Sequence, residues 1–144
     1  MGRERTKNGI KGRFLALPHG VMDAPSFISL SAPATRLLLD IARQYSGTNN
    51  GQLLCTLSAM KRRGWSSNDT LIRARRDLEA AGFIQQTRLP MMPRRAAWYG
   101  ITWRPLDYTA EMDIKPFEFV ANAYLLTPEE NKTRHRLPVA SSAG

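Results

Sequence analysis

The sequence predicts an α+β domain in which helices are followed by a two-stranded hairpin. Apolar residues recur at helical spacing after Ser31 and again within 67–81, a pattern typical of helices that bury one face. Two later segments, 83–88 and 96–103, are instead rich in β-branched and aromatic residues, which favours strands. A proline-containing loop, 89–95, separates these segments, so we expect the two strands to form a hairpin.

The first helix is expected to begin at Ser31. Its hydroxyl can accept a hydrogen bond from the free N–H groups at a helix start, and Pro33 lies in the first turn, where a missing N–H costs nothing. The apolar stripe that should face the core consists of Leu37, Leu38, Ile41, Ala42 and Tyr45. The turn-forming run 46–51, SGTNNG, then ends the helix.

A short extended piece, 52–55, is expected before the second and third helices. The second helix starts at Thr56 or Ser58 and runs to Arg63, before Gly64. The third spans 67–81, and the S-x-x-D pair at its start, Ser66 and Asp69, predicts a capping box. Its inward face is predicted to consist of Leu71, Ala74, Leu78 and Ala81, and Gly82 suits the left-handed position after a helix end.

Four regions follow from this pattern. Residues 1–12 are polar and basic and predict a flexible arm, and 13–105 form the folded domain. Residues 106–126 are expected to dock on that domain as a strand or short helix, and 127–144 are expected to be a disordered tail. At the start of the domain, short strands or single turns should cover the core with Phe14, Leu15, Leu17, Phe27 and Leu30.

The charge of the chain is strongly positive and unevenly distributed. There are 21 Lys and Arg against 12 Asp and Glu, a net of +9. Residues 1–103 carry 16 basic and 6 acidic residues, whereas 104–144 carry 5 and 6, so the whole excess lies in the first 103 residues. A basic domain favours a polyanionic partner, nucleic acid before a membrane, with a merely solvated basic surface as the alternative.

Cysteine content and hydropathy indicate where the chain resides. A lone Cys55 excludes an internal disulfide and a cysteine-rich zinc site, and it suits a reducing compartment. No run approaches the ~20 apolar residues of a membrane span, and the apolar run 14–18 is too short for a signal peptide. We therefore expect a soluble, cytoplasmic protein without a membrane partner.

The segment 57–84, LSAMKRRGWSSNDTLIRARRDLEAAGFI, resembles a winged helix-turn-helix domain. The resemblance implies a three-helix core with a two-stranded β wing, in which 67–81 is the recognition helix. The matching residues are Thr70, Leu71, Ala74, Leu78, Gly82 and Ile84, where the family has Thr, aliphatic, Ala, Leu, Gly and Ile. Arg75 departs from the pattern, because an aliphatic residue is usual there, and it should reach the core edge or pair with an acid. A looser resemblance, over 17–53, is to small winged-helix proteins of phages and mobile elements, including replication-associated ones.

A recognition helix in the major groove must bury one stripe and present polar groups on the other. With Leu71 facing inward and 100° per residue, the outward residues are Asn68, Asp69, Ile72, Arg73 and Arg76. Asn68 suits adenine, Arg73 and Arg76 suit guanine or phosphate, and Ile72 suits a thymine methyl. Ser66 and Ser67, at the helix start, can hold a phosphate. The alternative is an ordinary amphipathic helix with a solvated basic face.

Basic residues on either side of this helix extend the predicted DNA-binding set. Lys61, Arg62 and Arg63 immediately precede it, and Arg94 and Arg95 in the wing are natural minor-groove or phosphate contacts. Met91 and Met92 at the wing tip are expected either to tuck under the loop or to contact a protein.

No pattern in the sequence indicates an enzyme, a cofactor or a metal site. His19 and His135 lack ligand spacing, and there is no Gly-rich phosphate loop or nucleophile elbow. The first expectation is therefore sequence-specific binding of double-stranded DNA, as a transcription regulator or replication-associated protein of a phage or mobile element. A homodimer that reads two half-sites is compatible with the resemblance.

Two other functions remain open. In the first, the winged helix is redirected to protein binding, as in a phage-encoded inhibitor of a host nucleic-acid-binding protein, through the wing tip and segment 117–126, FEFVANAYLL. In the second, single-stranded nucleic acid stacks on Trp65, Trp98, Tyr99 and Trp103. Alternation along 96–103 favours core packing for most of these aromatic residues.

Overall fold

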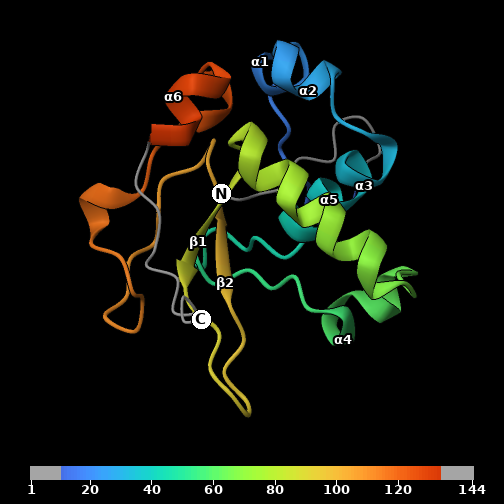
Figure 1. Cartoon of the computed structure of the whole chain (residues 1–144), viewed down its shortest axis with the longest axis vertical. Coiled ribbons are helices and arrows are strands. Elements are labelled where there is room, and N and C mark those ends of the chain that lie inside the picture. The colour runs from blue at the N-terminus through green and yellow to red at the C-terminus, as the bar shows by residue number, and fades with distance from the viewer. Residues whose placement is uncertain (1–10, 134–144) are drawn as a thin grey trace.

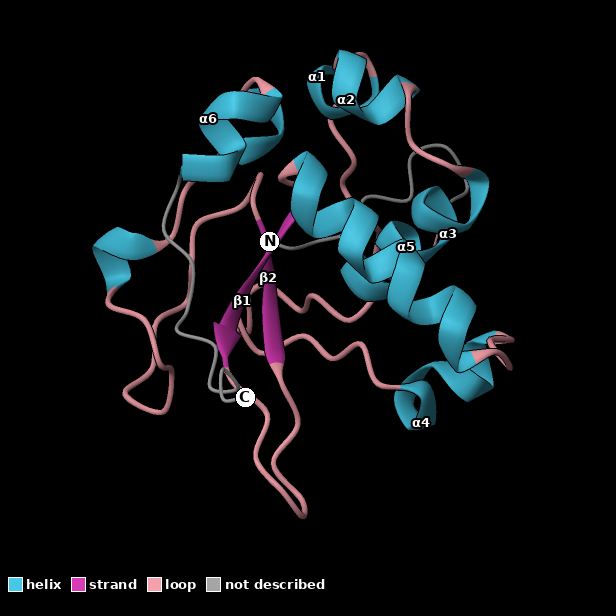
Figure 2. Ribbon diagram, viewed as in Figure 1, coloured by secondary structure: helices cyan, strands magenta, loops and turns pink. Residues whose placement is uncertain are grey.

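The computed structural model describes residues 11–133, which adopt an α+β fold (Figure 1). The labelled helices lie above and to the right of a two-stranded antiparallel sheet, whose connecting loop projects from the body of the molecule (Figure 2). Within residues 11–133, no helix has the length and apolar character needed to cross a bilayer. In chain order the elements are α1 (His19–Met22), α2 (Pro25–Ile28), α3 (Ala32–Ala42), α4 (Leu57–Met60), η1 (Lys61–Arg63), α5 (Asn68–Ala81), β1 (Ile84–Arg88), β2 (Trp98–Ile101), η2 (Pro116–Glu118), η3 (Ala123–Leu125) and α6 (Pro128–Thr133).

Helix α3 begins where its cap predicts. The Ser31 hydroxyl accepts a hydrogen bond from the Ala34 N–H at 3.2 Å, and a proline occupies the first turn. Its predicted apolar stripe is buried except for Tyr45, which lies beyond the helix end and is half-buried. Upstream, the chain forms two single-turn helices, one of the two outcomes expected there, and Leu17, Phe27 and Leu30 pack against the core. Phe14 and Leu15 are exposed, so the expectation that they cover the core was wrong.

Helix α5 is longer than its neighbours and packs against α3 through Leu71, Ala74 and Leu78. Its cap is Ser67, whose hydroxyl accepts a hydrogen bond from the Thr70 N–H at 3.2 Å. The prediction of a Ser66–Asp69 capping box was therefore wrong. Ser67 has the extended backbone that a cap requires, and so the helix begins one residue later, at Asn68.

The hairpin β1–β2 is tied to the segment between α3 and α4. Leu53 and Tyr99 exchange two backbone hydrogen bonds of 2.9 Å, so residue 53 forms a one-residue extension of the sheet beside β2. Nearby, the buried amide of Asn50 accepts from the Ile101 N–H and donates to the Ile101 carbonyl. These bonds hold the hairpin base in a fixed position relative to the helices.

The residues after the hairpin pack back onto the domain. Phe83 is fully buried, stacks on Tyr124 at 5.3 Å between ring centroids, and meets Phe27 edge-on at 6.0 Å. The last helix, α6, packs on α5, although the sequence had predicted disorder from residue 127. The predicted arm, apart from Lys11 and Gly12, and the rest of the predicted tail lie outside the described residues.

Candidate nucleic-acid interface

The segment α4–η1 presents two of the predicted cations to solvent. Thr56 caps α4 by accepting a hydrogen bond from the Ala59 N–H at 3.1 Å. Lys61 and Arg62 in η1 are exposed, and neither forms an ion pair within the described residues. Gly64 then reverses the chain with φ of +95°, a left-handed conformation that favours glycine.

The third predicted cation of this run, Arg63, is held by a buried carboxylate. Its Nε donates to Asp40 at 3.0 Å, and the indole N–H of Trp65 donates to the other oxygen of Asp40 at 2.8 Å. Arg36 donates to the Arg63 carbonyl and lies 5.0 Å from the centre of the Trp65 ring. Arg63 therefore anchors the turn between η1 and α5, and its charge is partly neutralised.

The start of α5 is open to solvent, as the phosphate-holding hypothesis requires. Ser66, Ser67 and Asn68 are all exposed. The first N–H groups of a helix have no intrahelical partner and carry partial positive charge. Asp69 is also exposed in this first turn, and its carboxylate opposes a phosphate at the same place.

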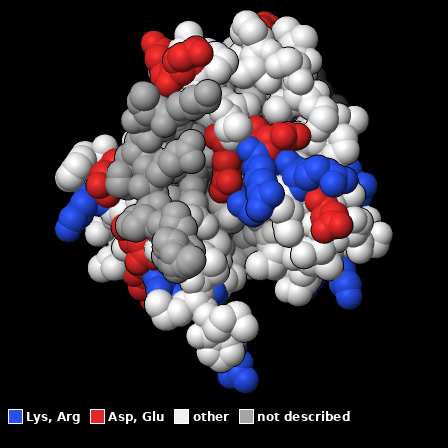
Figure 3. All heavy atoms as spheres, in the orientation of Figure 1, with Lys and Arg blue, Asp and Glu red and all other residues white. Residues whose placement is uncertain are grey.

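The outward face of α5 has no net positive charge. Arg73 and Arg76 are exposed, as predicted, whereas Ile72 is only partly exposed. Asp69 and Asp77 are exposed on the same helix, so two arginines are balanced by two aspartates. Figure 3 shows acidic and basic side chains interleaved over the region of α5. The middle of this helix is thus a mixed-charge surface.

Arg75 pairs with an acid, one of the two outcomes expected for it. Its guanidinium lies 3.1 Å from Glu79, one turn further along α5. Burial disfavours the charge, but the neighbouring Tyr99 and Glu79 together raise the pKa of Arg75 above its ordinary value. Arg75 is consequently part of the helix–hairpin contact rather than of the outward surface.

The tip of the hairpin, residues 91–95, carries the other predicted cations. Arg94 is exposed, whereas Arg95 lies 3.3 Å from Asp113, in the segment after β2. Met91 is 57% exposed and Met92 is 88% exposed, so the expectation that they tuck under the loop was wrong. Figure 3 shows basic side chains near this end of the molecule.

Arg88, which the sequence did not single out as functional, forms the floor of the hairpin tip. Its guanidinium lies 3.6 Å from the centre of the Trp98 ring and donates twice to the Ala96 carbonyl, at 3.2 and 2.8 Å. Burial and the nearby Arg95 lower the pKa of Arg88. An arginine and a tryptophan near the two ends of the predicted loop were the only available signal for this contact.

The aromatic platform expected for single strands is not assembled. Trp65 and Tyr99 are buried in the core, and the Trp103 ring N–H donates to the Ala16 carbonyl at 3.3 Å. Burial also raises the pKa of the Tyr99 phenol. Cys55 is a core residue, and burial raises the pKa of its thiol to about 12.

The described residues thus present three exposed surfaces. They are Lys61 and Arg62 in η1, the start of α5, and the hairpin tip. The hairpin tip and α4 both lie in the lower half of the molecule's long axis, whereas α1, α2 and α6 lie at its upper end (Figure 1). Comparison with protein-family models, curated proteins and solved structures finds no match to this chain.

Proposed function

We propose that this chain is a winged helix that binds double-stranded DNA without catalysing a reaction. The proposal rests on one arrangement: a short helix with exposed cations, a tight turn, a longer helix with an open start, and a projecting hairpin. The Leu53–Tyr99 bridge supports it, because it joins the segment between the first two core helices to the hairpin. The major groove of DNA admits an α-helix, and its base edges carry a distinct pattern for each pair.

The distribution of charge assigns different tasks to the contacts. Lys61, Arg62 and Arg94 are exposed and have no acidic partner within the described residues, so we assign them to phosphates. Asn68 and Arg73, at the open end of α5, are assigned to base edges. The other predicted residues are assigned secondary contacts with the DNA; they are Ser66, Ser67, Ile72 and Arg76. Arg63 is paired with Asp40, and Arg95 is paired with Asp113. We therefore assign these two arginines mainly to holding the fold rather than to contacting phosphates.

The biological role within this proposal is that of a transcription regulator or replication-associated protein of a phage or mobile element. Its support is the looser sequence resemblance of 17–53 to such proteins, beside the resemblance of 57–84 to a winged helix-turn-helix domain. Selection of bound duplexes from a randomised pool, followed by sequencing, tests the sequence-specific binding that this role requires. A defined motif that is lost in an Arg73→Ala variant supports base reading, whereas enrichment without any motif contradicts it.

Fluorescence anisotropy with a labelled duplex tests the binding surface itself. The double variant Lys61→Ala/Arg62→Ala should bind more weakly and with a salt dependence reduced by about two phosphate contacts, a slope change of roughly 1.8. Lys115→Ala is the matched control, because Lys115 is exposed and precedes η2, across the molecule from α4 (Figure 1). Equal binding by both variants would contradict the assigned surface.

A second candidate function is protein binding by a redirected winged helix, such as a phage-encoded inhibitor of a host nucleic-acid-binding protein. Two observations favour it: the balanced charge on the outward face of α5, and Phe117, which is 83% exposed in the segment after the hairpin. A pull-down with and without nuclease distinguishes the two functions. A protein that is recovered in stoichiometric amount after nuclease treatment, and that Phe117→Ala no longer recovers, supports this candidate. Recovery of partners only in the absence of nuclease contradicts it.

A further inference from the structure

The hairpin tip is an ordered projection with a methionine at its end. Met91 and Arg95 exchange two backbone hydrogen bonds of 2.8 Å, which close the tip below residues 92–94. Arg95 also contacts the Met91 sulfur at 4.0 Å and lies 3.3 Å from Asp113. The tip is therefore held at its base, while Met92 is 88% exposed. An apolar side chain held out in this way gains nothing from the fold itself.

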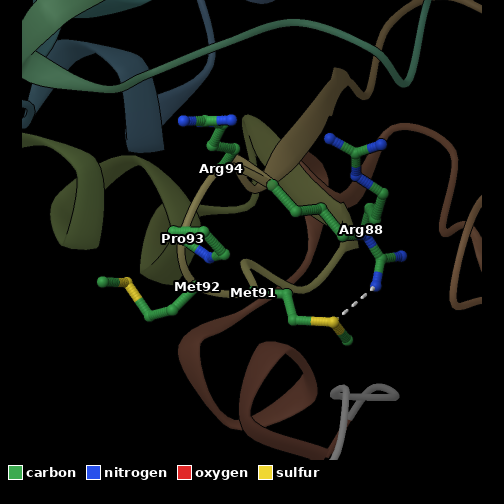
Figure 4. A pocket seen from close by; sticks show the side chains of 6 residues that line it. Arg88, Met91, Met92, Pro93 and Arg94 are labelled. Carbon is green, nitrogen blue, oxygen red and sulfur yellow. Dashed lines mark hydrogen bonds between the residues drawn. The ribbon is translucent and has the colours of Figure 1, made fainter.

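The two methionines differ in direction. In Figure 4 the Met91 side chain turns toward the arginine that contacts its sulfur, whereas Met92 points to the opposite side of the loop. Arg94 also extends from the tip, and it is exposed. Met91 thus contacts an arginine of the hairpin itself, whereas Met92 is free to enter a partner.

The charge around the tip favours an anionic partner. An open pocket of about 390 Å³ is lined by Arg88, Met91, Met92, Pro93, Arg94 and Arg95. Residues 83–103 contain three arginines and no acidic residue, but Glu111 and Asp113 of the segment after β2 lie near Arg88, and Asp113 pairs with Arg95. The exposed Arg94 therefore carries the unpaired positive charge of the tip. A surface that combines cations with an apolar point is complementary to a polyanion with an apolar interior. Duplex DNA is such a partner, because its phosphates enclose stacked bases.

We propose that the hairpin tip enters the minor groove of duplex DNA and inserts Met92 between two base pairs, so that the protein kinks the duplex. This inference rests on the proposed DNA-binding function. Methionine is one of the side chains that act as apolar wedges in the minor groove, where such insertion kinks DNA by roughly 20–90°. Unstacking a base step costs free energy, which the added backbone contacts offset. Arg94 supplies such a contact beside the wedge.

Bending and affinity are measured separately so that the two proposals can fail separately. The probe is a duplex of about 25 base pairs with central TA steps, which kink easily, and with a donor and an acceptor dye at its ends. Bound wild-type protein should raise the energy-transfer efficiency, and Met92→Ala should lose most of this rise. Met92→Leu, which keeps the apolar volume, should retain it. Ile28→Ala, which removes an exposed apolar side chain from α2, is the matched control and should also retain it.

Two results would overturn the insertion of Met92, and a third would overturn DNA binding as well. Binding by wild type with no rise in transfer efficiency would overturn the wedge and leave DNA binding intact. Equal rises for wild type and Met92→Ala would also overturn it. If no variant binds duplex DNA by anisotropy, the proposed function fails and the wedge fails with it. A 2-aminopurine placed at the central step gives a second readout, since unstacking brightens it only when Met92 is present.

Discussion

The carboxylate of Asp40 is predicted to contribute more to stability than any exposed acid of the fold. Its side chain is only 8% exposed and accepts from the Trp65 indole at 2.8 Å and from Arg63 at 3.0 Å. In Asp40→Ala the buried indole N–H loses its acceptor, which costs about 1–3 kcal/mol. The Arg63 side chain is 49% exposed, so solvent screening limits its contribution to about 0.2–1 kcal/mol.

The sum, about 1–4 kcal/mol, is measurable by thermal unfolding. At roughly 3 °C per kcal/mol for a chain of this size, the midpoint should fall by about 3–12 °C. The Asp40→Asn side chain keeps one acceptor oxygen, so the unfolding midpoint of this variant should fall by less. The matched control is Asp23→Ala, which removes an exposed carboxylate at the end of α1 and should shift the midpoint little. Equal midpoints for Asp40→Ala and Asp23→Ala would refute the reasoning.

Three further changes test local features of the fold. Ser67→Ala should lower the free energy of unfolding by about 1 kcal/mol, because α5 loses its cap. Ser66→Ala should change the free energy of unfolding by less than about 0.5 kcal/mol. Equal losses for the two variants in urea titrations would contradict the assignment of Ser67 as the cap. Gly82→Ala should lower the melting temperature more than Gly47→Ala. Both glycines have positive φ, but of the two only Gly82 lies where an added Cβ would meet the backbone of η3. Equal shifts would contradict the close packing of η3 on Gly82. Burial raises the pKa of Cys55 from 9.0 to about 12, so the unfolded chain releases a proton that the folded chain keeps, and the free energy of unfolding should fall as pH rises from 9 toward 12. Urea titrations across this range should show a shallower fall for Cys55→Ala, and an unchanged fall would refute the assignment.

The helices and the hairpin were predictable because their signals are local. The apolar stripe after Ser31 and the strand-like segments around the loop 89–95 depend only on nearby residues. The exact start of α5 was not predictable, because Ser66 and Ser67 are adjacent and both can cap a helix. The backbone conformation of Ser67, set by how the turn packs, decides between them.

The charge state of the candidate site was the part that sequence reasoning missed. Arg63 is held by Asp40, 23 residues earlier, and Arg95 by Asp113, 18 residues later. Pairs this distant leave no local pattern, so both arginines were counted as DNA contacts. One signal for Asp40 did exist: it lies among Leu37, Leu38 and Ile41, and a carboxylate on an apolar stripe indicates a buried partner.

The most direct test of DNA binding is the salt dependence of affinity for a duplex. If Lys61, Arg62 and Arg94 alone contact phosphates, log affinity against log salt should have a slope of about −2.7, and with Arg73 and Arg76 about −4.5. Adding Arg63 and Arg95 gives all seven predicted cations and a slope of about −6.3, so the measured value also tests whether these two arginines are neutralised. A slope between about −2.7 and −4.5 is the result we predict. An affinity that is weak and nearly independent of salt would contradict a DNA-binding surface on this chain.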